Sequence, residues 1–456
     1  MIAYSVISKS QLEGTRRLDA EYYQPEYLEI VQKIQSVPHT SLDSYAEKVF
    51  SGPLGSTLKS ESYQETGVPF IRISDISDLF IDQDTLVFIS PSEHKRIYST
   101  HLSVGDIVLS KIGTVGRLSV ISEELGEVNI SENNIGIRLS KLPEEKKIAL
   151  LFLLLGKYGQ KQLLRKASGN IQLKLNVSDV ESIQVPIFDE VMLRALMDIY
   201  TDFLSKRNES DSLYLQAENL LLEKLGLKNF KADEDLYSVV NFSNIKSANR
   251  MDAEYFQPKY ERLIVKLKAQ KAQPLVDVLE SISAKFNPLT QADKIFKYVE
   301  LSNINGSIGI IDGYTETSGR EAPSRAKRVL KKGDVVVSTV EGSLGKVALV
   351  HKEQEGCLAS TGFFQFRSED LLPEVLLVIA KSFIFHNQLE QRCAGTILTA
   401  VPKDSIKDIL VPILPKATQE KIAGLVRESH TARKKAKELL EEAKRTVEEF
   451  IEQKTK

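Results

Sequence analysis

One phrase of the sequence occurs twice. R-L-D-A-E-Y-Y-Q-P-E-Y runs from Arg17 to Tyr27, and R-M-D-A-E-Y-F-Q-P-K-Y runs from Arg250 to Tyr260. Eight of the eleven positions are identical, and the phrases lie 233 residues apart. Agreement of this extent within one chain indicates that part of the sequence is duplicated.

Further matches follow in the same order through both halves. The matched pairs are P-F-I-R-I-S-D-I (69–76) with K-Y-V-E-L-S-N-I (297–304), G-D-I-V-L-S (105–110) with G-D-V-V-V-S (333–338), S-G-N-I (168–171) with A-G-T-I (394–397), and I-Q-V-P-I (183–187) with I-L-V-P-I (409–413). Solenoid repeats have periods of roughly 20 to 50 residues, far shorter than this spacing. The chain therefore contains two copies of a whole domain.

Each copy has the pattern of an α+β domain. Short β-branched stretches bounded by Gly, Pro, Asp or Ser predict strands, and in the first copy these are V-P-F-I-R-I-S, T-L-V-F-I-S, D-I-V-L-S-K-I and I-G-I-R-L-S. One helical stretch follows from Pro143, with acids in its first turn, and its counterpart begins at Pro373. We expect two globular domains, at 1–187 and 227–413, each within the usual size range.

Each copy ends in a long polar stretch with a narrow apolar stripe. The stretches run from about Glu190 to Leu225 and from about Lys416 to Glu452, within segments 188–226 and 414–456. The stripe advances by alternating steps of four and three residues, which is typical of a coiled coil. The seam residues are Leu196, Tyr200, Phe203, Arg207, Ser210, Tyr214, Ala217, Leu221 and Lys224 in the first helix, and Ile422, Val426, Ser429, Arg433, Ala436, Leu440, Ala443, Val447 and Phe450 in the second.

These two helices are expected to pack on each other. A duplicated chain most simply associates its copies about a pseudo-two-fold axis, and that axis would make the helices antiparallel. Arg207 and Arg433 occupy equivalent seam positions. Either they fix the register of the pair, or their charged ends reach to water. Some 36 residues of helix would extend about 54 Å, so the pair could act as a ruler between two domains.

The composition indicates a globular protein of several domains. The chain has 456 residues, 42% of them hydrophobic and 27% charged. Its longest apolar run, Ile148 to Leu155, is far shorter than the roughly 20 residues of a membrane span. No signal peptide is evident, and Cys357 and Cys393 lack metal-binding spacing, so a reduced, cytoplasmic protein is the simplest expectation. A net charge of −2 excludes a uniformly cationic coating protein and leaves room for a local basic surface.

Motifs of catalysis are missing from the sequence. It has no P-loop, H-E-x-x-H or G-x-S-x-G pattern. The string F-N-P-L-T at 286–290 lacks the second proline and the aromatic residue of an adenine methyltransferase motif. The six histidines are scattered without metal-ligand spacing. We therefore expect no catalytic residue, no metal and no cofactor.

The ordered duplication, the two helices of matching register, the G-D-(I/V)-V-(L/V)-S strands and the S-G-N-I-Q-L-K-L…V-P-I exit resemble specificity (S) subunits of type I restriction–modification systems. The resemblance covers essentially the whole chain. It implies two target-recognition domains, each reading one half of a split double-stranded DNA site, and a helix pair that sets the gap between the half-sites. It also implies a non-catalytic subunit that docks two methyltransferase (M) subunits, which restriction (R) subunits then join in a host-defence endonuclease complex.

Candidate DNA contacts are basic or amide side chains on loops flanking the shared strands. Such groups can bind phosphates or read base edges. They are Lys59, Arg72, Lys111, Arg117, Asn170, Gln172 and Lys174 in the first copy, and Arg320, Arg325, Lys327, Arg328, Lys346 and Thr396 in the second. The alternative is that each is an ordinary solvated surface residue. S-G-P-L-G-S-T-L-K-S-E-S-Y-Q (51–64) has no visible match in the second copy, so the two half-sites should differ.

Two other functions fit the same pattern. One is a two-domain scaffold for protein partners, which would lack the salt dependence of DNA binding. The other is the specificity subunit of a different bipartite system, whose partner fuses methylation and cleavage. The repeated phrase itself is expected to be structural. Pro25 and Pro258 suit a first helical turn, and Tyr22, Tyr23, Tyr255 and Phe256 would pack where each domain meets the helix pair.

Overall fold

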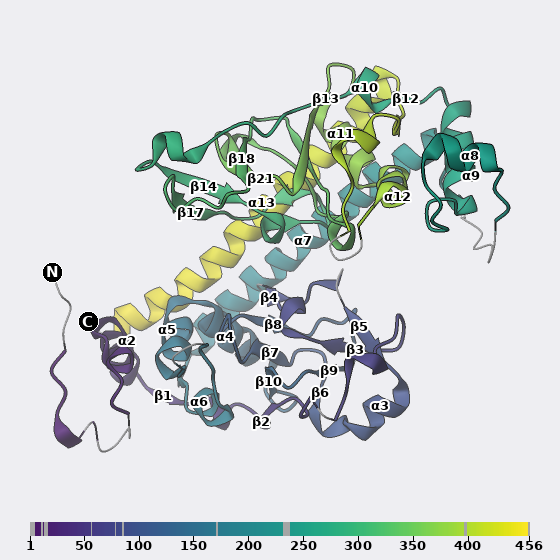
Figure 1. Ribbon diagram of the computed structural model, residues 1–456. Helices are drawn as coiled ribbons and strands as arrows, with labels where there is room; N and C mark the ends of the chain where they lie inside the picture. The colour runs from purple at the N-terminus through teal and green to yellow at the C-terminus, as the bar shows by residue number, and fades with distance from the viewer. Residues whose placement is uncertain are drawn as a thin grey trace. The chain divides into compact units, whose positions relative to one another are not determined.

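The computed structural model describes residues 5–10, 12, 17–55, 57–77, 79–83, 86–169, 172–230, 238–395 and 399–454. Contacts divide the chain into two units (Figure 1). Unit 1 holds Met1–Leu204 and Ala436–Lys456, and unit 2 holds Ser205–Lys435. Each unit thus takes one half of each long helix. The expected boundaries at 187, 226 and 413 stay a prediction.

Unit 1 contains three sheets. The five-stranded sheet has the order β2-β10-β7-β8-β4, the four-stranded sheet β5-β3-β9-β6, and the third pairs β1 with β11. The strands are β1 (His39–Ser41), β2 (Lys48–Ser51), β3 (Val68–Ile71), β4 (Leu79–Phe80), β5 (Val87–Ile89), β6 (His101–Leu102), β7 (Ile107–Ser110), β8 (Leu118–Val120), β9 (Val128–Ile130), β10 (Asn134–Arg138) and β11 (Gln184–Pro186). The four stretches predicted as strands in the first copy are confirmed as β3, β5, β7 and β10.

Among the described residues, unit 2 repeats this topology with one additional strand, β15, at the edge of its large sheet. Its sheets have the orders β13-β22-β19-β20-β16-β15, β17-β14-β21-β18 and β12-β23. The strands are β12 (Gln273–Pro274), β13 (Glu280–Ser281), β14 (Ile295–Val299), β15 (Ile304–Asn305), β16 (Ile310–Ile311), β17 (Thr315–Ser318), β18 (Ala326–Val329), β19 (Val335–Ser338), β20 (Val347–Leu349), β21 (Leu358–Ser360), β22 (Phe363–Arg367) and β23 (Leu410–Val411). Even the one parallel pair of the four-stranded sheet recurs, β3 with β9 and β14 with β21. The duplication predicted from the sequence is therefore confirmed in the strand topology.

The helices complete both units. They are α2 (Pro25–Gln35), α3 (Pro91–Arg96), α4 (Glu144–Leu155), α5 (Lys157–Lys166), α6 (Val177–Glu181), α7 (Glu190–Lys224), α8 (Phe242–Ala248), α9 (Pro258–Ala269), α10 (Leu275–Val278), α11 (Pro373–Lys381), α12 (Phe383–Arg392) and α13 (Lys416–Lys454). Short 3-10 turns are η1 (Ala20–Tyr23), η2 (Leu42–Ser44), η3 (Ser60–Ser62), η4 (Ile73–Asp75), η6 (Tyr98–Thr100), η7 (Pro288–Gln291), η8 (Leu301–Asn303), η9 (Glu341–Ser343), η10 (Lys352–Gln354) and η11 (Lys403–Ile406). None of the helices described is both long enough and apolar enough to span a bilayer.

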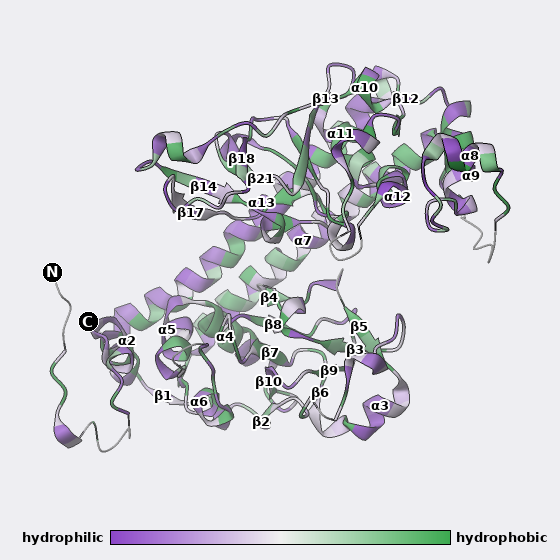
Figure 2. Ribbon diagram, in the orientation of Figure 1, coloured by the Kyte–Doolittle hydropathy of each residue, from purple (hydrophilic) through white to green (hydrophobic). Residues whose placement is uncertain are grey.

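The helical stretch after Pro143 is divided in two, which differs from the single helix we expected. Gly156 adopts an extended conformation between α4 and α5, and Ser382 does the same between α11 and α12. A Cβ at Gly159 would lie 2.3 Å from the carbonyl oxygen of Leu153. The backbone of α5 therefore approaches the end of α4 so closely that only glycine fits at this position. Figure 2 shows α4 hydrophobic along most of its length, as suits a helix buried inside a core.

The two long helices are confirmed within two residues of their predicted ends. In unit 1, the ring of Phe188 packs at a tilt against the ring of Phe450, with centroids 5.2 Å apart. In unit 2, the Ser429 hydroxyl donates to the carbonyl of Ser210 at 2.8 Å. The start of α7 thus lies beside the end of α13, and its later half beside the first half of α13. The helices run antiparallel, as the sequence predicted.

Candidate nucleic-acid interface

Two loops of unit 1 that are distant in sequence form one surface. The loop after β7 and the segment 172–175 are joined by backbone hydrogen bonds: the Gly113 N–H donates to the Leu173 carbonyl at 3.1 Å and the Leu175 N–H to the Lys111 carbonyl at 2.9 Å. Burial lowers the pKa of Lys111, and the nearby charge of Lys174 acts in the same direction. A Cβ added at Gly113 would lie 3.4 Å from the Gln172 amide nitrogen. The structure therefore brings three predicted contacts, Lys111, Gln172 and Lys174, into one cluster, which we call the basic cluster.

Unit 2 has the same junction with different side chains. The backbone N–H of Glu341 donates to the carbonyl of Thr399 at 3.1 Å, and that of Val401 to the carbonyl of Thr339 at 2.8 Å. These bonds are equivalent to the two backbone bonds of unit 1. Thr339 replaces Lys111, and Ala400 replaces Lys174. The two units thus share this pair of backbone hydrogen bonds, which we call the backbone frame, but only unit 1 carries the two lysine charges on it.

A pocket of about 380 Å³ lies beside the basic cluster of unit 1. Its lining includes Tyr63, Phe70, Arg72, Glu132 and Asn133. Aromatic faces can stack on nucleobases, and guanidinium and amide groups can reach base edges.

The backbone around this pocket is tightly fitted. A Cβ at Gly52 would lie 2.1 Å from the Ser131 carbonyl oxygen, so the stretch after β2 passes directly against the turn between β9 and β10. The Lys111 ammonium donates to the Ser51 hydroxyl at 2.8 Å and so connects the loop after β7 to the end of β2.

Arg72 is tied to a buried acid. Its guanidinium donates to both oxygens of the fully buried Asp75, at 3.1 and 3.0 Å. This fork fixes the guanidinium at the pocket. Arg72 therefore already has a structural role beside its predicted contact with DNA.

Two more of the predicted residues of unit 1 lie at the surface. Lys59 is exposed and precedes η3. Arg117 is exposed and donates to the carbonyl of Ile76 at 3.4 Å. Asn170 lies outside the described residues, as does Thr396 in unit 2.

One local expectation for unit 2 is wrong. We expected residues 325–328 to lie on a loop, but Ala326–Val329 form β18, whose side chains alternate between buried and exposed. Arg328 points inward and is 7% exposed. Its guanidinium donates to the Ile282 carbonyl at 2.6 Å, and burial lowers its pKa. Lys327 faces outward, and Arg325 is exposed just before the strand.

The remaining basic residues of unit 2 are less uniform. Arg320 is exposed and pairs with Asp293 at 3.2 Å. Lys346 is half-buried at the end of the loop that follows β19. Contact with DNA stays a prediction for every residue in both units.

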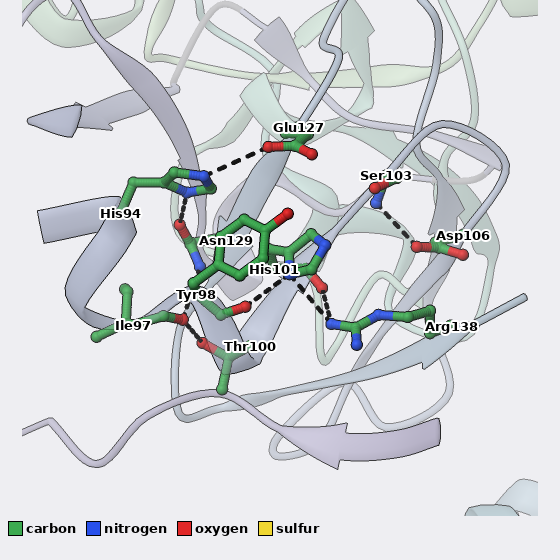
Figure 3. A network of polar contacts seen from close by, with 10 residues as sticks. All are labelled: His94, Ile97, Tyr98, Thr100, His101, Ser103, Asp106, Glu127, Asn129 and Arg138. Carbon is green, nitrogen blue, oxygen red and sulfur yellow. Dashed lines mark hydrogen bonds and ion pairs between the residues drawn. The ribbon is translucent and has the colours of Figure 1, made fainter. Parts of the chain in front are cut away.

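A polar network holds α3 on the four-stranded sheet of unit 1 (Figure 3). Asn129, fully buried on β9, accepts a hydrogen bond from Nδ1 of His94 at its amide oxygen, and its amide nitrogen donates to the Ile97 carbonyl at 3.2 Å. The His101 ring stacks on Tyr98, with centroids 3.9 Å apart, and Arg138 donates to the His101 carbonyl at 2.7 Å. The network fixes a segment between β5 and β6 that has no helical counterpart between β17 and β18.

The predicted seam residues are mostly buried. Leu196, Phe203, Ala443 and Val447 are buried in unit 1, as are Ala217, Leu221, Ile422 and Val426 in unit 2. Tyr214 and Ala436 are also buried, Tyr200, Leu440 and Phe450 are half-buried, and Lys224 is exposed.

The polar seam positions cluster in unit 2. Ser210 and Ser429 are fully buried and hydrogen bonded to each other. Burial lowers the pKa of Arg433, and the nearby charge of Asp211 opposes that shift. Arg207 is half-buried, and its positive charge further lowers the pKa of Arg433. Whether the arginines fix the register stays a prediction.

The arginines of the repeated phrase attach to the ends of short helices, whereas the packing of its aromatic residues where each domain meets the helix pair stays a prediction. In unit 1, Arg17 pairs with Asp19 and donates to the carbonyls of Lys166 and Ala167, at the end of α5. In unit 2, Arg250 pairs with Asp252 and donates to the Cys393 carbonyl at 2.9 Å, at the end of α12. The phrase therefore caps equivalent helix ends, where carbonyls lack intrahelical partners.

Comparisons with known proteins give structural matches alone. No family model and no curated protein matches the chain. Solved structures do match. The S subunit of a type I restriction–modification system from M. genitalium is 13% identical, with a TM-score of 0.37, over 91% of this chain and 95% of that chain. The HsdS subunit from Thermoanaerobacter tengcongensis is 13% identical, with a TM-score of 0.28, over 92% and 96%. A chain from a study of assembly and conformational transition in the type I R-M system is 13% identical, with a TM-score of 0.30, over 92% and 98%.

Sequence reasoning missed several residues of the pocket. Tyr63, Glu132 and Asn133 line it, and none of them lies in a basic or repeated stretch. The turn S-E-N-N between two strands was the available signal, because short polar turns at strand ends often carry binding residues. Among the described residues, no group of three or more His, Cys, Asp or Glu could hold a metal ion.

Proposed function

We propose that the chain is a DNA sequence-recognition subunit that carries out no chemistry itself. Each unit would read one half of a split, asymmetric double-stranded site. In the cytoplasm it would direct two methyltransferase subunits, and through them restriction subunits, to that site. The partners follow from the sequence resemblance to type I specificity subunits.

One observation carries the recognition part of this proposal. Both units build the same frame around the loop after β7 or β19, with equivalent backbone bonds. On that frame, unit 1 carries Lys111 and Lys174, where unit 2 carries Thr339 and Ala400. A shared frame with different side chains suits two readers of different base sequences, because base-edge contacts specify and the frame only positions them.

The helix pair supports the spacing role. The helix α7 has 35 residues and α13 has 39. At 1.5 Å per residue, α7 is about 52 Å long. A continuous helix changes length in fixed steps, so it can set the distance between half-sites.

Methylation sequencing of cells that express this chain with the methyltransferase subunit of its own system tests the proposal directly. We expect one interrupted, asymmetric motif. Insertion of one heptad into both α7 and α13 should lengthen the central gap by about 10 Å, or about three base pairs, with unchanged half-sites. A change in the half-sites themselves would contradict the spacing role.

A swap tests the modular part. Replacing Val49–Ser140 with the equivalent stretch of a relative should change one half-site and leave the other. Binding that does not weaken with salt would favour a protein scaffold instead. A single partner polypeptide that both methylates and cleaves would favour the fused type of system.

A further inference from the structure

One short turn has the same backbone in both units. It is η4, after β3, in unit 1 and η8, after β14, in unit 2. The backbone N–H of Arg72 donates to the carboxylate of Asp75 at 2.8 Å. In unit 2, the backbone N–H of Glu300 donates to the amide oxygen of Asn303 at 2.9 Å. The carbonyls of Asp75 and Asn303 each accept one further backbone bond of 2.8 Å. Arg72 and Glu300 therefore occupy equivalent positions on one shared turn.

The side chains at these equivalent positions have opposite charge. Unit 1 carries Arg72 and unit 2 carries Glu300. The residue three positions later differs as well, because Arg72 is followed by the acid Asp75 and Glu300 by the neutral Asn303. A second carboxylate at position 303 would repel Glu300. The two copies thus differ at this turn by a coordinated pair of residues.

The turn itself does not require the charge of Asp75. Asn303 supplies the same acceptor in unit 2 without a charge. The carboxylate of Asp75 is fully buried and accepts from the guanidinium of Arg72 at 3.1 and 3.0 Å. Burying a charge is costly unless it is paired, so the arginine that it holds accounts for this acid. A guanidinium held in place loses less freedom when it binds a ligand.

Glu300 is also held, by a different group. The hydroxyl of Ser302 donates to Oε1 of Glu300 at 2.9 Å, and Glu300 is exposed. In unit 1, the equivalent hydroxyl of Ser74 donates to Asp75 at 3.0 Å instead. Each turn therefore fixes one charged side chain at its first position. The fixed group is a hydrogen-bond donor in unit 1 and an acceptor in unit 2.

The surroundings of Arg72 suit a nucleobase. Arg72 lines the pocket of about 380 Å³ that Tyr63 and Phe70 also line. Aromatic rings can stack on bases, and an arginine can donate to a base edge. A guanidinium has five N–H donors, so a carboxylate and a base edge can share it.

We propose that Arg72 and Glu300 are the equivalent base-reading residues of the two units, with opposite hydrogen-bonding sense. This inference rests on the proposed function and names the bases that the two residues select. Arg72 donates to O6 and N7 of guanine, the edge that an arginine fork fits. Glu300 accepts from N4 of cytosine. Adenine also offers an amino group, but its N7 lone pair would face the carboxylate. Each half-site should therefore contain at least one G·C pair.

The test uses the full-length chain co-expressed with the methyltransferase subunit of its own system. Methylation sequencing gives the motif, and fluorescence anisotropy on duplexes with single base-pair replacements gives the preference at each position. Glu300→Gln keeps the size of the side chain and adds a donor, and glutamine pairs with N6 and N7 of adenine. We expect the preference at one base pair of one half-site to shift from C·G to A·T by at least about fivefold, with the other half-site unchanged.

The double variant Arg72→Gln with Asp75→Asn tests unit 1. Its asparagine supplies the acceptor that the turn uses in unit 2, and its net charge equals that of the wild type. One G·C pair of the other half-site should shift to A·T by a similar factor. Glu369→Gln is the matched control, because it removes an exposed acid that follows β22 and lies outside the turn. It should leave every base preference unchanged.

The possible results separate this inference from the proposed function. Unchanged preferences in either folded variant, or changes in both half-sites from one variant, would overturn the inference and leave the proposed function standing. So would a wild-type half-site made of A·T pairs alone. If the wild-type chain gives neither a methylated motif nor salt-dependent DNA binding, the proposed function fails, and this inference with it. Thermal unfolding shows whether each variant is folded. Because Glu300 is exposed, Glu300→Gln decides the question even if the double change in unit 1 prevents folding.

Discussion

The histidine pair of unit 2 gives a prediction whose size can be worked out. His430, on α13, is 9% exposed. Its Nε2 lies 2.8 Å from the Ile308 carbonyl, and its Nδ1 lies 3.0 Å from Nε2 of His351. A carbonyl oxygen only accepts, so Nε2 of His430 carries the proton and Nδ1 accepts from His351. Both rings are then neutral.

Acid should weaken this arrangement. Burial lowers the pKa of His430 from 6.5 to about 4, and nearby His351 and Lys381 act in the same direction. Because the folded-state pKa is the lower one, the unfolded chain takes up the proton first as the pH falls. The stabilisation is complete above about pH 6.5 and is lost as the pH falls towards 4. For His430 alone, the loss in free energy of unfolding between pH 8 and pH 5 is about 2 kcal/mol.

The position equivalent to His430 in unit 1 is occupied by Leu204. A leucine should therefore fit at position 430 and remove this pH dependence. His430→Leu should destabilise the protein at pH 8 by about 1–3 kcal/mol, since the Ile308 carbonyl and His351 lose their partner. It should also make the further loss at pH 5 smaller by about 2 kcal/mol. Urea unfolding at both pH values, with pulse-labelling hydrogen exchange in peptides around His430, measures both effects. His39→Leu in unit 1 is the control. Equal losses on acidification in wild type and His430→Leu would refute the buried neutral pair.

Three further predictions concern the frame and the surface. Replacing Lys111 and Lys174 together with alanine should lower the salt slope of DNA binding by about 1.8, at about 0.9 per lost phosphate contact, measured by fluorescence anisotropy; an unchanged slope would remove both from the interface. Arg250→Ala should cost about 1–2 kcal/mol in urea unfolding, because the carbonyl at the end of α12 loses its charged donor; no cost would contradict the capping role. Gly52→Ala should destabilise by about 1–3 kcal/mol, as its Cβ meets the backbone. Gly342→Ala, with open space around it, should change little.

Local patterns predicted much of the fold and less of the site. β-branched runs and the steps of four and three were sufficient to find β3, β7, β10, α7 and α13, because burial on one face leaves a periodic trace. The breaks at Gly156 and Ser382 left no such trace, since the apolar pattern continues across them. Arg328 was placed wrongly because a basic run looks like a loop until the strand alternation turns one of its side chains inward.

The sequence by itself determined that this molecule is built twice, with two long helices and with different loop side chains in the two copies. Matching order, spacing and register are properties of the chain, so they can be read without coordinates. Only the tertiary structure decided which side chains meet. Lys111 and Lys174 lie 63 residues apart and become neighbours through backbone pairing. The phrase of Arg17 and Arg250 proved to be a helix cap, because its partners are carbonyls about 150 residues away that carry no sequence signal.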